Sequence, residues 1–202
     1  MKQKELEMLL QDVPLLQDPQ PKLEQYHTPA PIAADILYTA VLHHDIIDKT
    51  VMDLACGTGI FAVGAALLGA RQVYGIDLDE RCIAIARRYA EQQHLTINFS
   101  VQEVQEVSGS YDTVVMNPPF GAQKKNKKAD RKFIEKSFAI AKVFYSLHLS
   151  STCPFLETMI SSLGGTITLV KSYTFPIKHT FFFHEKPRVF FDVTLLRVST
   201  GQ

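Results

Sequence analysis

The 202-residue sequence has no tryptophan, only 3 cysteines and no excess of charge of either sign. Cys56, Cys82 and Cys153 are odd in number and lack the close spacing of zinc ligands, so we expect free thiols and no metal site. The 21 basic residues are balanced by 21 acidic residues. This balance argues against nucleic-acid binding over the whole surface, although a local basic patch is still compatible with it.

Long apolar runs are also missing. No stretch is long enough to cross a bilayer, and the N-terminal residues lack the apolar core of a secretion signal. We therefore expect a cytoplasmic protein that does not contact a membrane. The spacing of Leu6, Leu10 and Val13 predicts a short helix, and prolines follow it. The expected organisation is an N-terminal helix and connector over residues 1–22, followed by one folded domain over residues 23–202.

A strand, a glycine turn and a helix follow one another from residue 50 onward. Residues 50–54 predict a buried strand, and Gly57 and Gly59 allow a tight turn that a ligand can approach closely. A second strand over residues 72–76 ends in Asp77, where a carboxylate can accept from both hydroxyls of a ribose. The repeated unit predicts a doubly wound α/β fold.

Two further places offer polar groups to the same ligand. Glu103 follows a predicted third strand over residues 95–101 and could accept from an adenine amino group, but a solvated glutamate explains it equally well. Gln25 and Thr28 stand before a helix that has Pro29 at its first position, where Thr28 fits the role of a cap. A ligand role for Gln25 and Thr28 is the alternative.

The segment Asn117-Pro118-Pro119-Phe120 follows a predicted fourth strand over residues 111–116. The two prolines fix the backbone and hold the Asn117 side chain in place. An exocyclic or amide nitrogen is a poor nucleophile, and acceptors on its N–H groups would stabilise the charge that develops during attack on a methyl group. The Asn117 oxygen and the Pro118 carbonyl are such acceptors, and Phe120 is expected to offer an apolar face to a base.

Basic residues follow directly. Lys124, Lys125, Lys127, Lys128 and Arg131 predict phosphate contacts beside the methyl acceptor, although charge runs are usually solvated faces. His184 and Lys186 suggest a second basic contact.

The rest of the chain predicts more helices and strands. Asp130 is expected to cap a helix with an inward stripe at Ile134, Phe138, Ala141, Tyr145 and His148, in which His148 has a structural role. Another helix is expected over residues 152–163, and strands over residues 166–170, 175–183 and 189–198.

A glycine loop alone would also fit a nicotinamide dinucleotide. Here, however, Ala62 replaces the third glycine of that pattern, and no phosphate-binding lysine follows the loop, which argues against a nucleoside triphosphate. The glycine loop, Asp77, Glu103 and the Asn117 segment together fit S-adenosylmethionine and methylation of an amino group.

Four segments together resemble one family: residues 23–29, 53–59, 116–121 and 143–148. It is the methyltransferase-like protein five family, which makes N6-methyladenosine in small-subunit ribosomal RNA. The resemblance implies a Rossmann-like class I methyltransferase fold, with a seven-stranded, mostly parallel sheet and helices on both faces. It also implies catalysis by the Asn117–Phe120 motif, and a small zinc-binding activator protein such as eukaryotic members have. We expect any such partner to use the third-strand edge, by strand addition. The implied cofactor contacts are Gln25, Thr28, Ala55, Cys56, Gly57, Thr58, Gly59, Ile60, Asp77, Glu103 and Val104.

The sequence departs from the commoner methyltransferase pattern at Ala55, where glycine is frequent, and at Glu103, where aspartate is usual. The rival enzymes are a glutamine-N5 methyltransferase of release factors, which has a related Asn-Pro-Pro-Tyr motif, and a DNA amino-methyltransferase. A rival from another class is a non-catalytic RNA-binding scaffold on a methyltransferase fold.

Overall fold

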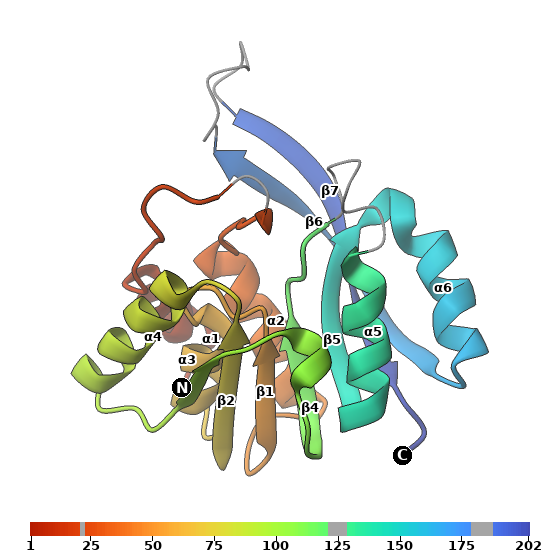
Figure 1. The fold of residues 1–202 in the computed structure, drawn as a ribbon, viewed down its shortest axis with the longest axis horizontal. Helices are drawn as coiled ribbons and strands as arrows, with labels where there is room; N and C mark the ends of the chain where they lie inside the picture. Colours follow the sequence, from red (N-terminus) through yellow and green to blue (C-terminus); the bar gives the residue numbers. More distant parts are fainter. Residues whose placement is uncertain (21–22, 121–128, 179–187) are drawn as a thin grey trace.

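The computed structural model describes residues 1–20, 23–120, 129–178 and 188–202. Their centre is a sheet of seven strands with helices on both faces (Figure 1). The strands are β1 (Thr50–Leu54), β2 (Gln72–Asp77), β3 (Asn98–Val101), β4 (Tyr111–Met116), β5 (Ala141–Leu149), β6 (Thr166–Lys178) and β7 (Arg188–Ser199). Their order across the sheet is β3-β2-β1-β4-β5-β7-β6.

The first five strands run parallel, and β7 joins β5 antiparallel before it pairs with β6. In a doubly wound sheet, the strand order reverses beside the first strand. Ligands bind outside the carboxyl ends of the strands near that point. Here β1 lies between β2 and β4, so the segments that follow these three strands meet at one edge. The predicted fold class is confirmed.

In the described part of the chain, six α-helices cover the sheet in two layers. They are α1 (Gln3–Gln11), α2 (Ala30–Leu42), α3 (Ile60–Leu67), α4 (Glu80–Gln92), α5 (Ala129–Ile140) and α6 (Cys153–Ser162), with short 3-10 turns at η2 (Val104–Glu106) and η3 (Ser150–Thr152). Helices α1 to α4 contribute to one buried apolar cluster, and α5 and α6 contribute to the other. The last four residues of β1 and of β4 are all buried, as expected for strands covered on both faces.

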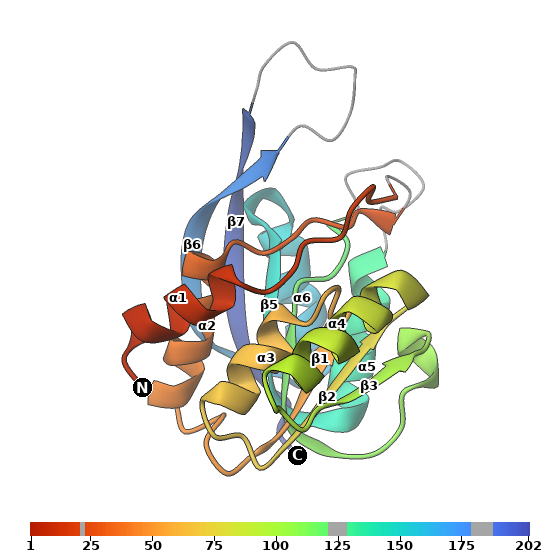
Figure 2. The ribbon, with the colours of Figure 1, turned by 90° about the vertical axis from the view of Figure 1, so that its left-hand side faces the viewer.

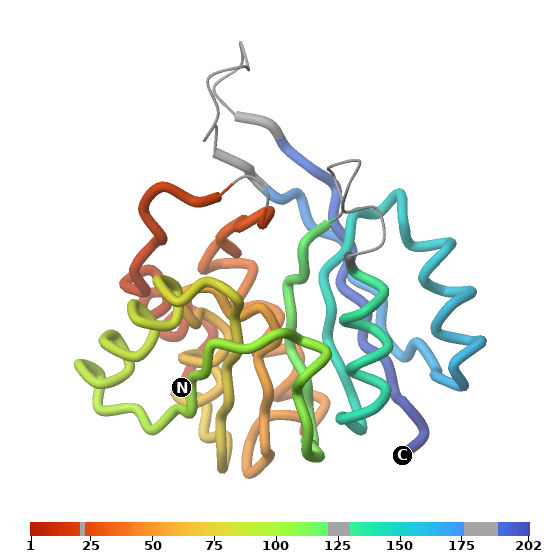
Figure 3. The backbone as a smooth tube through the Cα atoms, in the orientation of Figure 1, coloured from red at the N-terminus to blue at the C-terminus, as the bar shows by residue number. Residues whose placement is uncertain are grey.

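The N-terminal helix belongs to the first of these clusters. Leu6 and Leu10 of α1 are at most 1% exposed and pack with α2 and α3. Both chain termini lie in the lower half of the view in Figure 3. Within the described ranges, no helix combines the length and the apolar character that crossing a bilayer requires.

The prediction of one helix reaching His148 is wrong. Helix α5 ends at Ile140, and the next residue, Ala141, begins β5. No glycine or proline marks this boundary, so the helical spacing of the apolar stripe continues into the strand with no signal in the sequence that the helix has ended. The pairing of β5 with β4 on one side and β7 on the other decides its conformation. Asp130 lies in the first turn of α5 rather than at the cap.

After α6, the described residues form fewer and longer strands than predicted. Residues 166–178 instead form the single strand β6, with a register irregularity between Ile167 and Leu169, and residues 179–183 of the strand expected over residues 175–183 lie outside the described residues. Pro176 is tolerated because β6 is an edge strand of the sheet. His148 has the structural role that was expected, because it is 1% exposed and its Nε2 lies 2.6 Å from the Ser146 hydroxyl.

Figure 2 shows that β6 and β7 extend beyond the other strands. They extend past the carboxyl ends of β1, β2 and β4 (Figures 1 and 2). The long pair therefore stands beside the edge of the sheet where the site lies.

Candidate active site

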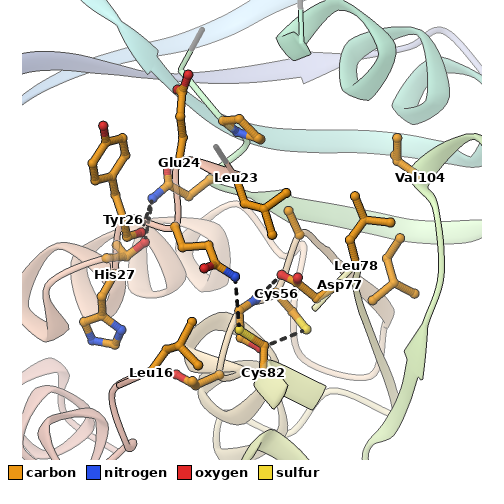
Figure 4. Close-up of a pocket in the computed structure, with 18 of the residues that line it drawn as sticks. Leu16, Leu23, Glu24, Tyr26, His27, Cys56, Asp77, Leu78, Cys82 and Val104 are labelled. Carbon is orange, nitrogen blue, oxygen red and sulfur yellow. Dashed lines mark hydrogen bonds between the residues drawn. The ribbon is translucent and has the colours of Figure 1, made fainter. Parts of the chain in front are cut away.

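A cavity of about 220 Å³ opens at the carboxyl ends of β1, β2 and β4. Figure 4 shows Tyr26 and His27 on one side of it and Asp77, Leu78 and Val104 on the other. Its lining contains most of the residues that the sequence predicted: Gln25, Thr28, Ala55, Cys56, Gly57, Thr58, Ile60, Asp77, Glu103, Val104, Asn117 and Pro119. Gly59, Pro118 and Phe120 do not line it.

The glycine loop between β1 and α3 forms the floor of the cavity. Gly57 and Gly59 have φ angles of 55° and 92°, in the left-handed region that glycine adopts without strain. A Cβ added at Gly59 would meet the Phe99 ring at 3.0 Å, so this glycine is also required for packing. Ala55 has a φ of 57°, so the position where the sequence departs from glycine carries backbone strain.

Asp77 at the end of β2 holds this loop. Its Oδ2 accepts a hydrogen bond from the Gly57 N–H at 2.8 Å, and its Oδ1 accepts from the Asp79 N–H at 2.9 Å. Each carboxylate oxygen has a second lone pair, so both can still accept from a ligand. Burial raises the pKa of Asp77 above the ordinary range, and these backbone donors act against that rise.

Asp53 lies beneath the loop in β1 and is 1% exposed. Its Oδ2 accepts from the Ala62 N–H at 2.9 Å and so joins β1 to α3. Burial raises the pKa of Asp53 to about 8, and the nearby Asp77 adds to the rise. Burial also raises the pKa of the Cys56 and Cys82 thiols, so both are uncharged near neutral pH.

The segment from Gln25 to Thr28 also lines the cavity. The Gln25 amide nitrogen donates to Asp79 Oδ2 at 2.9 Å, next to Asp77. Thr28 does not cap α2 as expected, because Pro29 occupies the cap position and no side chain bonds there. The Thr28 hydroxyl instead accepts from the side-chain nitrogen of Asn117 at 3.0 Å.

Phe120 is not open to a base, contrary to the prediction. It is 5% exposed, and the Tyr26 ring stacks on it with a centroid separation of 5.9 Å and an interplanar angle of 18°. Phe175 of β6 contacts it edge-on, also at 5.9 Å. Its apolar ring is thus buried by two other aromatic rings, and of these two Tyr26 lines the cavity.

Glu103 does not stand free at the end of β3. Its Oε2 lies 3.5 Å from Lys132 Nζ of α5, and both residues line the cavity. Other residues that line the cavity were not predicted from the sequence: Leu16, Leu23, Tyr26, Leu78, Cys82, Lys132 and Phe133. Most of them are apolar and look like ordinary core residues, so no pattern in the sequence distinguishes them.

The basic residues can be placed only in part. Arg131 of α5 lies with its guanidinium carbon 4.2 Å from the centre of the Phe155 ring of α6. Lys124, Lys125, Lys127, Lys128, His184 and Lys186 lie outside the described residues.

Comparison with known proteins decides the class. The methyltransferase small domain family matches residues 31–142, which is more than half of the chain. The rRNA N(6)-adenosine-methyltransferase METTL5 of Danio rerio is 36% identical over 208 residues, covering 98% of this chain and 99% of that protein. Its counterpart from Drosophila melanogaster is 32% identical and covers 100% and 98% of the two chains.

This chain belongs to the methyltransferase-like protein five family. The crystal structure of PH1948 from Pyrococcus horikoshii agrees, with a TM-score of 0.91, 33% identity and 98% coverage of both chains. The family match confirms the predicted class: the chain is an S-adenosylmethionine-dependent methyltransferase.

The cavity of this family member fits S-adenosylmethionine. Among the described residues, four buried side-chain polar atoms have no hydrogen-bond partner: Asp53 Oδ1, Thr58 Oγ1, Asn117 Oδ1 and Glu103 Oε2, and the last has only the 3.5 Å ion-pair contact with Lys132. Thr58, Glu103 and Asn117 line the cavity, and Asp53 lies directly under its floor. Buried polar groups are normally paired, so their concentration here indicates that the cavity is built to hold a polar ligand.

Proposed function

We propose that this enzyme methylates the N6 atom of an adenosine in small-subunit ribosomal RNA. The observation that carries the proposal is the side chain of Asn117. Its nitrogen donates to Thr28, while its oxygen is buried without a partner among the described residues. The full-length relatives named as rRNA N(6)-adenosine-methyltransferases support the choice of substrate.

The proposed chemistry follows from the unpaired side-chain oxygen of Asn117, which is free to accept a hydrogen bond. S-adenosylmethionine supplies an electrophilic methyl group when bound. The Asn117 oxygen would accept from one N–H of the adenine amino group, and the Pro118 carbonyl from the other. Both would stabilise the positive charge as the nitrogen forms its bond to the methyl carbon and the carbon–sulfur bond breaks. The methylated nitrogen then loses its proton to water, so no strong general base is required.

We assign the cofactor to the cavity between the glycine loop and the Gln25–Thr28 segment. Asp77 would accept from the ribose hydroxyls, because both of its oxygens keep a free lone pair. Glu103 would accept from the adenine amino group, and its neighbour Lys132 would stay paired with it. Ala55, Cys56, Gly57, Thr58, Gly59, Ile60 and Val104 would surround the cofactor or shape the loop that does.

The target base is proposed to stack on Phe120. Since Tyr26 covers that ring, the proposal includes a displacement of Tyr26 when the base enters. Base–aromatic stacking contributes roughly 1–3 kcal/mol per base, enough to replace the Tyr26 contact.

RNA phosphates are proposed to bind the basic residues that follow Phe120 in the sequence. Arg131, which is stacked on Phe155, offers a fixed guanidinium there. Replacing Lys124, Lys125, Lys127 and Lys128 together by serine is expected to weaken RNA binding and to flatten its salt dependence. His184 and Lys186 form the second proposed contact, to be tested by the same titration.

A small zinc-binding activator protein is proposed to add a strand at β3, one edge of the sheet. Val101, the last residue of β3, is 48% exposed. Val101→Asp is expected to weaken binding of the purified activator, whereas Val170→Asp at the β6 edge should not. We propose that the enzyme meets its ribosomal substrate in the cytoplasm, and cell fractionation would test that placement.

The deciding experiment offers four acceptors side by side, with S-adenosylmethionine carrying a tritiated methyl group. Small ribosomal subunits, naked ribosomal RNA, DNA and release factor are compared, and the product nucleosides are analysed by mass spectrometry. We expect N6-methyladenosine in ribosomal RNA. Methylglutamine in release factor or a methylated DNA base would replace the proposal with the corresponding rival. If RNA binds but S-adenosylmethionine does not, the non-catalytic scaffold is the better description.

Asn117→Ala tests the assigned role in the same assay. It is expected to abolish methyl transfer while leaving the affinity for S-adenosylmethionine within about twofold, because Asn117 acts on the acceptor. Full activity of this variant would refute the role of Asn117. If Asn117→Ala lost methyl transfer and cofactor affinity equally, Asn117 would instead be assigned to the cofactor site.

A further inference from the structure

The carboxamide of Asn117 has two ends of opposite hydrogen-bonding character. Its Oδ1 accepts and its Nδ2 donates. A methyl-accepting amine presents N–H groups, so it can be held only by Oδ1. If the carboxamide turned over, the side chain would present donors to donors. The rotation of this one group therefore decides whether the site can bind its substrate.

Two groups of the Gln25–Thr28 segment set that rotation. Asn117 Nδ2 lies 3.0 Å from the Thr28 hydroxyl and 3.5 Å from the Tyr26 backbone carbonyl. A hydroxyl can accept or donate, so Thr28 alone would fit either orientation. A carbonyl only accepts, and the two together select the nitrogen. The oxygen is then left at the cavity, buried and without a partner among the described residues.

Thr28 is itself fixed by the fold. It is 3% exposed, and the next residue, Pro29, accepts the first backbone bond of α2 from Ala33 at 2.9 Å. At the other end of the segment, Gln25 accepts from the Gln20 N–H at 2.7 Å and donates to Asp79 at 2.9 Å. The segment is held at both ends, so its hydroxyl is in place before any ligand arrives.

We infer that Thr28 is a positioning residue, which holds the Asn117 carboxamide with its oxygen turned towards the methyl acceptor. The inference rests on the proposed methylation of an amine. It differs from the direct contact between Thr28 and the cofactor that the family resemblance implies. A cofactor contact would change the affinity for S-adenosylmethionine, whereas a positioning contact acts through Asn117 on the rate of transfer.

Thr28→Val and Thr28→Ser separate the two roles. Valine keeps the shape and removes the hydroxyl, while serine keeps the hydroxyl. We expect Thr28→Val to lower kcat by about 10- to 100-fold, the usual range for a lost hydrogen bond that orders a catalytic group. The KM and Kd for S-adenosylmethionine and the Tm should change little. Thr28→Ser should restore most of kcat. The double variant Thr28→Val, Asn117→Ala should be no slower than Asn117→Ala.

A second measurement does not depend on activity. In the cofactor-free protein, the side-chain amide protons of Asn117 can be assigned by NMR through their loss in Asn117→Asp. Their exchange with solvent should be at least about tenfold faster in Thr28→Val than in the wild type or Thr28→Ser, because the restraining bond is gone.

The inference is overturned if Thr28→Val keeps wild-type kcat, if its main effect is weaker cofactor binding, or if exchange at Asn117 is unchanged. A different result is that Thr28→Val speeds exchange of the Asn117 amide protons but the wild-type enzyme makes no N6-methyladenosine. This result would refute the proposed function and leave the positioning contact standing. The two failures are thus distinguishable.

Discussion

The ring of Tyr26 lies on the ring of Phe120, with 5.9 Å between their centroids and 18° between their planes. A target base that stacks on Phe120 must take the place of Tyr26. Phe120→Leu should therefore lower kcat on small ribosomal subunits by about 10- to 100-fold, because the stacking energy is lost. Tyr26→Leu should lower it by less than about threefold.

Phe175→Leu serves as the control, since Phe175 contacts Phe120 only edge-on. It should reduce the free energy of unfolding without selectively lowering kcat. If Tyr26→Leu proved to be the slower enzyme, Tyr26 rather than Phe120 would be the residue that stacks on the base.

Asp77→Ala should weaken binding of S-adenosylmethionine by at least about tenfold, measured by calorimetry. The change removes the carboxylate assigned to the ribose and also the acceptor of the Gly57 N–H that holds the loop. Asp112→Ala removes an acid at the start of β4 that pairs with Lys142, and should leave the affinity unchanged. Equal affinities of the Asp77 variant and the wild type would argue against the ribose contact.

The stability of the cofactor-free protein should depend on pH through Asp53. Its folded pKa of about 8 lies above the unfolded value, so the protonated form stabilises the fold fully below about pH 4 and this contribution is lost as the pH rises towards 8. An asparagine at this position would be neutral at every pH and could still accept from the Ala62 N–H. Asp53→Asn should therefore raise Tm more at pH 8 than at pH 5, by about 2–4 °C or more.

Asp112→Asn is the matched control for this experiment. Its hydrogen bond with Lys142 lowers the pKa of Asp112 below the ordinary value. Its stabilising contribution is present above about pH 4 and is lost only on further acidification. Between pH 5 and pH 8 its replacement should change Tm by a constant amount. A constant difference for Asp53→Asn as well would show that Asp53 is already ionised.

Ala55→Gly should stabilise the protein, because Ala55 has a φ of 57°. Relief of the left-handed strain outweighs the greater freedom of glycine in the unfolded chain, and we expect a gain of about 0.5–1 kcal/mol in urea unfolding. Ala65→Gly in the buried face of α3 should destabilise by about 1 kcal/mol or more. Loss of stability in both variants would mean that the methyl group of Ala55 is needed for packing.

The sequence predicted the parts of this fold that are bounded by strong local signals. Glycines bound the loop after β1, and the strands over residues 50–54 and 111–116 were predicted at their observed limits. The boundary between α5 and β5 was missed because Ile140 and Ala141 fit either element, and only strand pairing distinguishes them. The site was predicted where a motif follows a strand. The places of Tyr26 and Lys132 in the cavity lining and the Thr28–Asn117 hydrogen bond were not predicted, because contacts between distant residues leave no local pattern.

Helix α5 passes into β5 without a connecting residue. This junction therefore has no loop residue that could absorb a change in chain length. One residue added or removed between Ile140 and Ala141 would shift β5 by one position against β4 and β7, and would turn every side chain of the strand to the opposite face. Tyr145, whose hydroxyl now donates to Asp45 at 2.6 Å, would point into the other layer. Differences in length among members of this family should consequently fall at loops, and this point of the chain should keep its residue count.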